Sequence, residues 1–294
     1  MRILVTVLLI CLVVQPYSSS LASPSSSEEK VSSKPELRLG IFPRRNAKIT
    51  AKIFQPLVDQ LTEKLNVEVV LETTHDFASF WDNVANRRYD IVHYNQYHYL
   101  KSHKQFGYRV IAQNVEFNHK SIAGAILVRR DSGINSARDL KGKTIVFGGG
   151  RGAMQAYITA TYLLRKAGLK QGDYFEQFAL NPPKACVAAY YRKAAAAGAG
   201  NYVLELPQVK KQIDVEEMKY LEVSEQMAHL PWAVKDTTDK EFQNKIQSTL
   251  VDLYKSAAGK KILKAAMITQ ILPATDKDYD THREIVKAVL NEEL

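Results

Sequence analysis

Residues 143–152 read Lys-Thr-Ile-Val-Phe-Gly-Gly-Gly-Arg-Gly, and a helical pattern follows from residue 153 to residue 166. The apolar residues predict a strand, and the glycines after it predict a turn that opens the helix. Glycines let the backbone approach a guest closely, and the first N–H groups of a helix favour an anion. Arg151 adds a fixed charge with a planar set of donors. We therefore expect a binding place for a small oxyanion at this turn, with a tight packing turn as the competing interpretation.

Strand patterns alternate with helical patterns on both sides of this unit. The expected strands are residues 37–42, 67–71, 90–94, 109–112, 121–129, 143–147, 175–180 and 219–223. The expected helices are residues 50–65, 76–86, 97–103, 153–166, 184–196, 240–254, 259–266 and 280–290. This alternation predicts an α/β fold with mostly parallel sheets that are flanked by helices.

The two series of strands and helices predict two lobes joined by two crossover strands. We expect the long apolar strand at residues 121–129 to form one crossover and the segment 224–235 to form the return. Lobe 1 then comprises residues 37–125 and 231–294, and lobe 2 comprises residues 126–230. A double crossover makes a hinge, so the lobes can close on a ligand. The carboxyl ends of the strands are the expected place for it.

The N-terminus and the composition favour an exported protein. Residues 1–22 have a basic start, a short apolar run and small residues at a cleavage site, which predicts a cleaved signal peptide. The Ser-rich residues 23–36 predict a disordered tether. Cys186 is the lone cysteine outside the signal, which fits a bacterial periplasm. The net charge of +9 comes from scattered basic residues, which argues against nucleic-acid binding and for a general attraction of anions.

Several motifs together resemble a known family. Residues 129–134 (Arg-Arg-Asp-Ser-Gly-Ile), residues 139–143 (Asp-Leu-Lys-Gly-Lys) and the glycine turn resemble the solute-binding proteins of ABC importers. Residues 272–280 with Arg283, and residues 89–92 with Gln96 and Tyr97, add to this likeness. The chain looks like the phosphate/phosphonate-type group of the type 2 periplasmic binding proteins from about residue 37 to its C-terminus.

The resemblance implies a monomeric periplasmic protein that holds a small oxyanion between two lobes and delivers it to an ABC permease. The oxyanion is a phosphonate, phosphite or phosphate-like ion, and no cofactor or metal is implied. The same fold also serves sensors that present their closed form to a membrane histidine kinase. An enzyme is disfavoured because no catalytic motif accompanies the fold. Members of the group carry Ser and Thr hydroxyls at the turn, where this chain has Gly-Gly-Arg-Gly-Ala-Met at residues 149–154.

The candidate ligand-binding residues follow the predicted strand ends. Arginines there can neutralise an anion, and amide and hydroxyl groups can donate hydrogen bonds to it. The resemblance also implies a short strand at the cleft near residues 194–201, where the pattern from the residues alone predicts the end of a helix. The candidates are Phe42, Arg44, Arg45, Tyr94, Asn95, His119, Lys120, Gly149, Gly150, Arg151, Gly152, Ala153, Tyr157 and Asn201.

Overall fold

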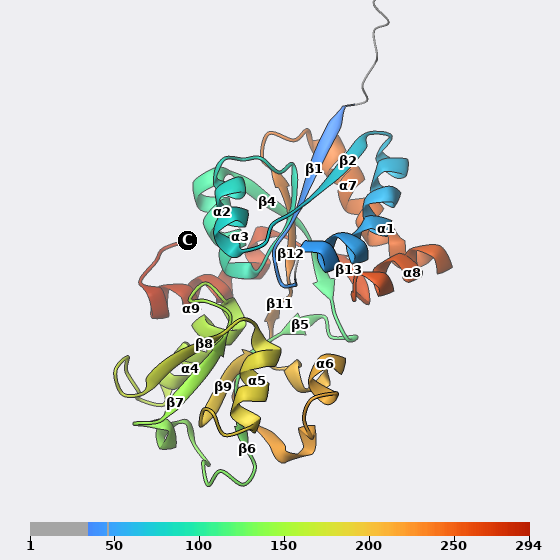
Figure 1. The fold of residues 1–294 in the computed structure, drawn as a ribbon. Coiled ribbons are helices and arrows are strands. Elements are labelled where there is room, and N and C mark those ends of the chain that lie inside the picture. The colour runs from blue at the N-terminus through green and yellow to red at the C-terminus, as the bar shows by residue number, and fades with distance from the viewer. Residues whose placement is uncertain (1–34, 46) are drawn as a thin grey trace, which may run out of the picture. The chain divides into compact units, whose positions relative to one another are not determined.

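The structure of residues 35–45 and 47–294 is a computed structural model. The expected signal peptide at residues 1–22 and most of the expected tether at 23–36 lie outside these residues. Glu36, which we assigned to the tether, is the first residue of the first strand. The strands of this part of the chain form a six-stranded sheet, a five-stranded sheet and a two-stranded ribbon (Figure 1). We call the part built on the six-stranded sheet lobe 1 and the part built on the five-stranded sheet lobe 2.

The six-stranded sheet has the strand order β13-β4-β12-β3-β1-β2. Its strands are β1 (Glu36–Ile41), β2 (Glu68–Thr73), β3 (Ile91–His93), β4 (Tyr108–Val115), β12 (Pro231–Lys235) and β13 (Gln270–Pro273). Strand β1 pairs parallel with β2 and β3, whereas β12 runs antiparallel to both β3 and β4. The sheet is therefore mixed, and our expectation of a mostly parallel sheet is corrected here. The antiparallel pairs arise because the chain returns to this sheet from lobe 2 through β12.

Helices cover both faces of the six-stranded sheet (Figure 1). One face carries α1 (Ala47–Leu65), α7 (Lys240–Asp252) and α8 (Ala257–Ala265), and the other carries α2 (Phe77–Ala85) and α3 (Gln96–Phe106). Trp232 is fully buried under the first group, where its ring stacks on that of His93 at a centroid distance of 4.3 Å. Apolar residues at helical spacing give α1 its buried stripe, as the sequence predicts.

The five-stranded sheet has the strand order β10-β6-β9-β7-β8 and is also mixed. Its strands are β6 (Gly124–Arg129), β7 (Thr144–Gly148), β8 (Phe175–Ala179), β9 (Ala196–Gly200) and β10 (Met218–Val223). Helix α5 (Pro182–Tyr190) packs on one face, and the π-helical turn η2 (Met154–Thr159) with its continuation α4 (Ala160–Lys166) packs on the other. The other helix of the described chain is α9 (Asp280–Leu290). The remaining helical segments are short: η1 (Ala137–Leu140), η3 (Val203–Glu205), α6 (Pro207–Lys210), η4 (Val215–Glu217), η5 (Leu253–Lys255) and η6 (Asp276–Tyr279).

Strand β9 is made entirely of alanine and glycine, and close packing explains why. A Cβ added at Gly198 would lie 2.2 Å from the carbonyl oxygen of Ala156 in η2 and 2.6 Å from the ring of Phe147. A side chain there would push η2 away from the sheet. The Ala-rich run that we expected to continue a helix to residue 196 therefore forms a central strand. The resemblance implied such a strand near residues 194–201, and that expectation is confirmed.

The crossover between the lobes is divided into two strands. Residues 121–129, which we expected to be one strand, form β5 (Ser121–Ile122) and β6, with Ala123 between them. Strand β5 pairs antiparallel with β11 (Met227–Ala228) from the returning segment. The two crossing segments are thus hydrogen-bonded to each other in a small ribbon of their own. The ribbon lies where the sequence predicts the hinge, at the two segments that cross between the sheets.

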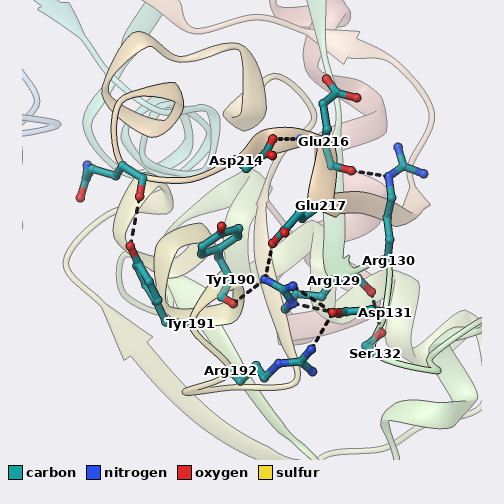
Figure 2. A network of polar contacts seen from close by, with 11 residues as sticks. Arg129, Arg130, Asp131, Ser132, Tyr190, Tyr191, Arg192, Asp214, Glu216 and Glu217 are labelled. Atoms are coloured by element: carbon teal, nitrogen blue, oxygen red, sulfur yellow. Dashed lines mark hydrogen bonds and ion pairs between the residues drawn. The ribbon is translucent and has the colours of Figure 1, made fainter.

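The Arg-Arg-Asp-Ser motif of residues 129–132 has a structural role at the end of β6 (Figure 2). Arg129 donates to both carboxylate oxygens of Asp131, at 2.8 and 2.9 Å, and its Nη1 lies 2.8 Å from Glu217. The same guanidinium lies over the ring of Tyr190 at the end of α5, 4.9 Å from its centroid, and Arg192 pairs with Asp131 at 2.7 Å. The motif therefore ties together the ends of β6, β10 and α5.

Candidate functional site

The carboxyl ends of three strands lie at one edge of the six-stranded sheet. Strands β1 and β3 pair parallel, and β12 lies antiparallel between β3 and β4, so β4 points the same way as β1 and β3. The loop at 42–45, the pair Tyr94 and Asn95, and Glu116 follow these strands directly. Residues far apart in sequence are thus brought to one edge, which is where open α/β sheets bind their ligands.

An ion pair between a buried carboxylate and a partly exposed guanidinium lies at this edge. Arg44 Nη1 lies 2.7 Å from Glu116 Oε1, and Asn114 Nδ2 donates to the same oxygen at 3.0 Å. Burial by itself would raise the pKa of Glu116, but the charge of Arg44 and these hydrogen bonds outweigh it and lower the pKa to about 2. Glu116 is therefore ionised near neutral pH, and it cancels the charge of Arg44.

Arg45 lies beside this pair without a carboxylate of its own among the described residues. Its Nη2 contacts the sulfur of Met267 at 3.1 Å, which is a weak acceptor for a guanidinium. Burial, and next the charge of Arg44, lower the pKa of Arg45 to about 10. Arg44, Arg45 and Glu116 together leave one positive charge in excess. We call the hollow that these residues line, together with Phe42, His93 and Asn114, the cationic recess; its volume of about 10 Å³ has room for about one water molecule.

His93 belongs to the core beneath the recess, as the sequence indicated. Its Nδ1 lies 2.9 Å from the carbonyl oxygen of Pro231, and burial lowers its pKa to about 3. Phe42 lies edge-on to it with the ring centroids 5.3 Å apart. The floor of the recess is therefore neutral, and its positive charge comes from the arginines alone.

The two lobes touch where α3 meets the glycine turn. Asn95 caps α3 through its Oδ1, which accepts from His98 N at 2.9 Å, and its Nδ2 donates to the carbonyl oxygen of Gly152 at 3.0 Å. The first intrahelical hydrogen bond of η2 is donated by Tyr157, so the N–H groups of residues 154–156 have no carbonyl within the helix. The start of η2 therefore presents free donors beside the beginning of α3.

Two of the four glycines in the turn are explained by packing within lobe 2. A Cβ at Gly148 would lie 2.2 Å from the backbone of Pro182, and Gly149 has a φ of 102°, which L side chains rarely adopt. A Cβ at Gly152 would lie 3.4 Å from the ring of His98 in lobe 1. Gly150 has open space around it. The packing interpretation thus accounts for Gly148 and Gly149, while Gly152 faces lobe 1.

Arg151 is held by residues of its own lobe. Its Nη2 lies 2.6 Å from Glu176 Oε2, another of its nitrogens donates to the hydroxyl of Tyr157, and its guanidinium lies over the ring of Phe178 at 5.4 Å. Glu176 belongs to β8, the edge strand of the five-stranded sheet. The charge of Arg151 is therefore already balanced at that edge. Tyr157, another candidate, is part of the same group.

The remaining candidates lie apart from the cationic recess or are already hydrogen-bonded. Tyr94 is fully buried in the core, where its hydroxyl accepts from Ser102 at 3.1 Å. Asn201 accepts from Ala123 N at 2.9 Å, at the hinge. The ring of His119 stacks on that of Tyr202 at 3.8 Å, and Lys120 beside it is exposed. Ala153 accepts from the N–H groups of Tyr157 and Ile158 and so forms the first turn of η2.

Sequence reasoning missed several polar residues near this edge. Glu116 carried no signal, because it lies four residues after the strand expected at residues 109–112. Gln96 entered only as part of the family resemblance. Gln155, His229 and His282 carried no signal, because nothing in the sequence shows that α3, η2, the returning segment and α9 meet. Their positions depend on the tertiary fold.

No helix in the described part of the chain is long and apolar enough to cross a membrane.

Comparison with known proteins agrees with the family resemblance of the sequence motifs. A family model described as "ABC transporter, phosphonate, periplasmic substrate-binding protein" matches residues 39–279.

Solved structures show the same fold at low sequence identity. A binding-protein component of a phosphonate ABC transporter from Pseudomonas aeruginosa is 15% identical, with a TM-score of 0.74 over 87% of each chain. PhnD1 from Prochlorococcus marinus, solved with methylphosphonate, is 19% identical, with a TM-score of 0.75 over 87% of this chain and 98% of that one. A Xanthomonas citri protein solved with ATP bound is 13% identical, with a TM-score of 0.74 over 87% of this chain and 97% of that one.

The family match covers both sheets and the hinge between them. It identifies a component of a transporter rather than an enzyme or a sensor, and it places the protein in the periplasm. The α/β fold with two lobes agrees with that of the solved relatives. The chain therefore belongs to the family of periplasmic substrate-binding proteins of phosphonate ABC transporters.

Proposed function

We propose that this protein captures a phosphonate or a similar small oxyanion at the cationic recess and delivers it to an ABC permease as a monomer. The observation that carries the proposal is the excess positive charge of Arg45, a guanidinium whose contact in the recess is the sulfur of Met267. A partly buried cation without a carboxylate of its own is costly, and a bound anion would offset part of that cost.

The start of η2 supplies the second half of the proposed site. The N–H groups of residues 154–156 point out of the first turn, and the positive end of the helix dipole adds to their attraction for an anion. These donors take the place of the Ser and Thr hydroxyls that the family carries at this turn. The Asn95–Gly152 hydrogen bond brings them close to lobe 1.

The proposed site keeps some of the sequence candidates and leaves others out. It uses Phe42, Arg44 and Arg45, which line the recess, and Asn95 and Gly152, whose hydrogen bond joins the two lobes. Ala153 is left out because its N–H already donates to the carbonyl oxygen of Gly150. We leave out Tyr94 because it lies in the core, and Arg151 and Tyr157 because Glu176 already engages them. Asn201, His119 and Lys120 lie at the hinge ribbon, and we assign them to it rather than to the anion. Gly149 and Gly150 shape the turn.

The proposal also names the membrane partner and the segment removed on export. The family match favours a permease over the histidine kinase that the sequence left open. We propose that residues 1–22 are removed on export, and mass spectrometry of the protein purified from the periplasm tests this by the mass of the mature N-terminus.

Calorimetric titration tests the proposed ligand class. We expect methylphosphonate to bind with a dissociation constant in the micromolar range or tighter, and we expect phosphate or phosphite to compete with it. Sulfate, matched to phosphate in size but different in protonation, is the control anion. Binding of every oxyanion at no better than millimolar strength would contradict the proposal.

Gly152 gives a graded test of lobe closure. A Cβ at this position meets ordinary van der Waals contact with His98 and Tyr97, so Gly152→Ala should keep the methylphosphonate affinity within about twofold. Gly152→Trp should weaken binding about tenfold, because overpacking by about 1–3 kcal/mol separates η2 from α3. Titration of both variants checks this, and equal affinities for the two would show that closure does not use this contact.

A further inference from the structure

A cluster of buried polar side chains lies where α3, η2, the returning segment and α9 meet. Each member is less than one-tenth exposed, and each has an atom without a hydrogen-bond partner among the described residues. Buried polar atoms are nearly always paired in folded proteins, so such a concentration calls for an explanation. These atoms are Gln96 Oε1, Gln155 Oε1, Thr159 Oγ1, His229 Nε2 and His282 Nδ1. We call these residues the polar cluster.

Contacts between neighbours hold the polar cluster together. Gln155 Nε2 lies 3.5 Å from His282 Nε2, and Gln96 donates to the carbonyl oxygen of Ala228, the residue before His229. Tyr279 donates to the carbonyl oxygen of His229 at 3.0 Å, and its ring centroid lies 5.5 Å from that of His282. Gln96, Gln155, His229 and His282 therefore belong to one region, and Thr159 lies four residues after Gln155 on η2.

The polar cluster adjoins the cationic recess. The N–H of His229 donates to Gln113, and Leu230 accepts from Asn114 N, so His229 sits next to the end of β4 that carries Glu116. Gln96 follows Asn95, which touches Gly152, and Gln155 lies three residues after Gly152. Gln96 and Gln155 thus lie next to the contact between α3 and the glycine turn.

The free atoms form a set of donors and acceptors without formal charge. His229 Nδ1 accepts from Leu230 N at 2.8 Å, so its proton is on Nε2, and the contact of His282 Nε2 with Gln155 leaves its proton on Nδ1. Burial lowers the pKa of His229 to about 4 and that of His282 to about 3, so both rings are neutral near pH 7. The nearby carboxylate of Glu116 is already paired with Arg44.

We propose that the polar cluster receives the organic substituent of the bound phosphonate, and that this substituent is neutral and carries a hydroxyl or carbonyl group. This inference rests on the proposed function of the recess. A hydroxyl can donate to a glutamine oxygen and accept from an imidazole N–H in the same place. An alkyl group would leave these atoms buried and unpaired. An ammonium group would be buried among neutral groups, without a carboxylate free to pair with it.

Titration with matched phosphonates tests the inference. We expect 2-hydroxyethylphosphonate to bind at least about tenfold more tightly than ethylphosphonate and than 2-aminoethylphosphonate, since each unpaired buried group costs about that much. Gln155→Leu should reduce the preference for the hydroxyl ligand over the ethyl ligand to about threefold or less. Gln177→Leu makes the same replacement at an exposed position of the same lobe and should leave the tenfold preference in place.

The outcomes separate this inference from the proposed function. If methylphosphonate binds but the ethyl, aminoethyl and hydroxyethyl ligands bind equally well, the polar cluster is not a substituent site and the anion site stands. If neither methylphosphonate nor phosphate binds, both proposals fail. Thr159→Val is a second variant for the case in which the Gln155→Leu protein is unfolded at 25 °C. An unchanged preference for 2-hydroxyethylphosphonate over ethylphosphonate in a folded Thr159→Val protein would count against the inference.

Discussion

Arg44→Met should lower the free energy of unfolding by about 3 kcal/mol. The substitution leaves Glu116 buried without its cation, and breaking a buried pair in this way costs about 3–5 kcal/mol. The side chain of Glu116 is 8% exposed and that of Arg44 is 33% exposed, which places the effect at the lower end of that range. Urea unfolding at pH 7, followed by circular dichroism, measures the loss.

The double variant Arg44→Met with Glu116→Gln is the control for this effect. Replacing both charges by neutral groups should restore most of the lost stability, because the buried pair itself contributes little net free energy. A double variant whose loss in the free energy of unfolding equals the sum of the losses of Arg44→Met and Glu116→Gln would contradict our account of the pair.

The pair also predicts how stability depends on pH. The folded pKa of Glu116 lies below its ordinary value of 4.5, so its stabilisation is present above about pH 4.5 and is lost as the pH falls toward 2. Unfolding measured between pH 6 and 2.5 should show this loss in the wild-type protein. The loss should be smaller in the double variant, and an equal loss would assign it to other carboxylates.

Arg45→Met should weaken the binding of methylphosphonate by about 1.5–3 kcal/mol, the usual contribution of a hydrogen bond to a charged group. This corresponds to about 10- to 150-fold in the dissociation constant. The substitution keeps the length and apolar character of the side chain next to Met267. It also removes a partly buried cation, so the stability of the free protein should not fall with the affinity.

Arg151→Met is the matched control for Arg45→Met. Arg151 is exposed and paired with Glu176, and exposed ion pairs contribute about 0–1 kcal/mol. We therefore expect its methylphosphonate affinity to stay within about threefold of the wild type. The reverse result, a large loss for Arg151→Met and none for Arg45→Met, would move the anion to the outer edge of lobe 2.

Much of the fold follows from local sequence patterns. The helix expected at residues 280–290 is found at those positions, and Asp76 caps α2 as expected. Such elements are predictable because capping and helical spacing are local properties. Strand β9 was not predicted from the residues, since alanine favours helices. Its strand conformation depends on the approach of η2 to Gly198, which is a tertiary contact.

The candidate site was less predictable than the fold. Loops at strand ends drew attention to Arg44, Arg45 and Asn95, and the structure brings these residues to one edge of the six-stranded sheet. The partner of each charge was not predictable. Arg44 faces Glu116 across 72 positions of sequence, and Arg151 is neutralised by Glu176 on a neighbouring strand. Which arginine keeps its charge free therefore depends on pairings that only the three-dimensional structure shows.

A crystal structure with methylphosphonate bound tests the central claim most directly. Our account predicts that the phosphonate oxygens lie within hydrogen-bonding distance of the Arg45 guanidinium and of the N–H groups at the start of η2. A phosphonate bound beside Arg151 and Glu176, with Arg45 still in contact with Met267, would contradict it.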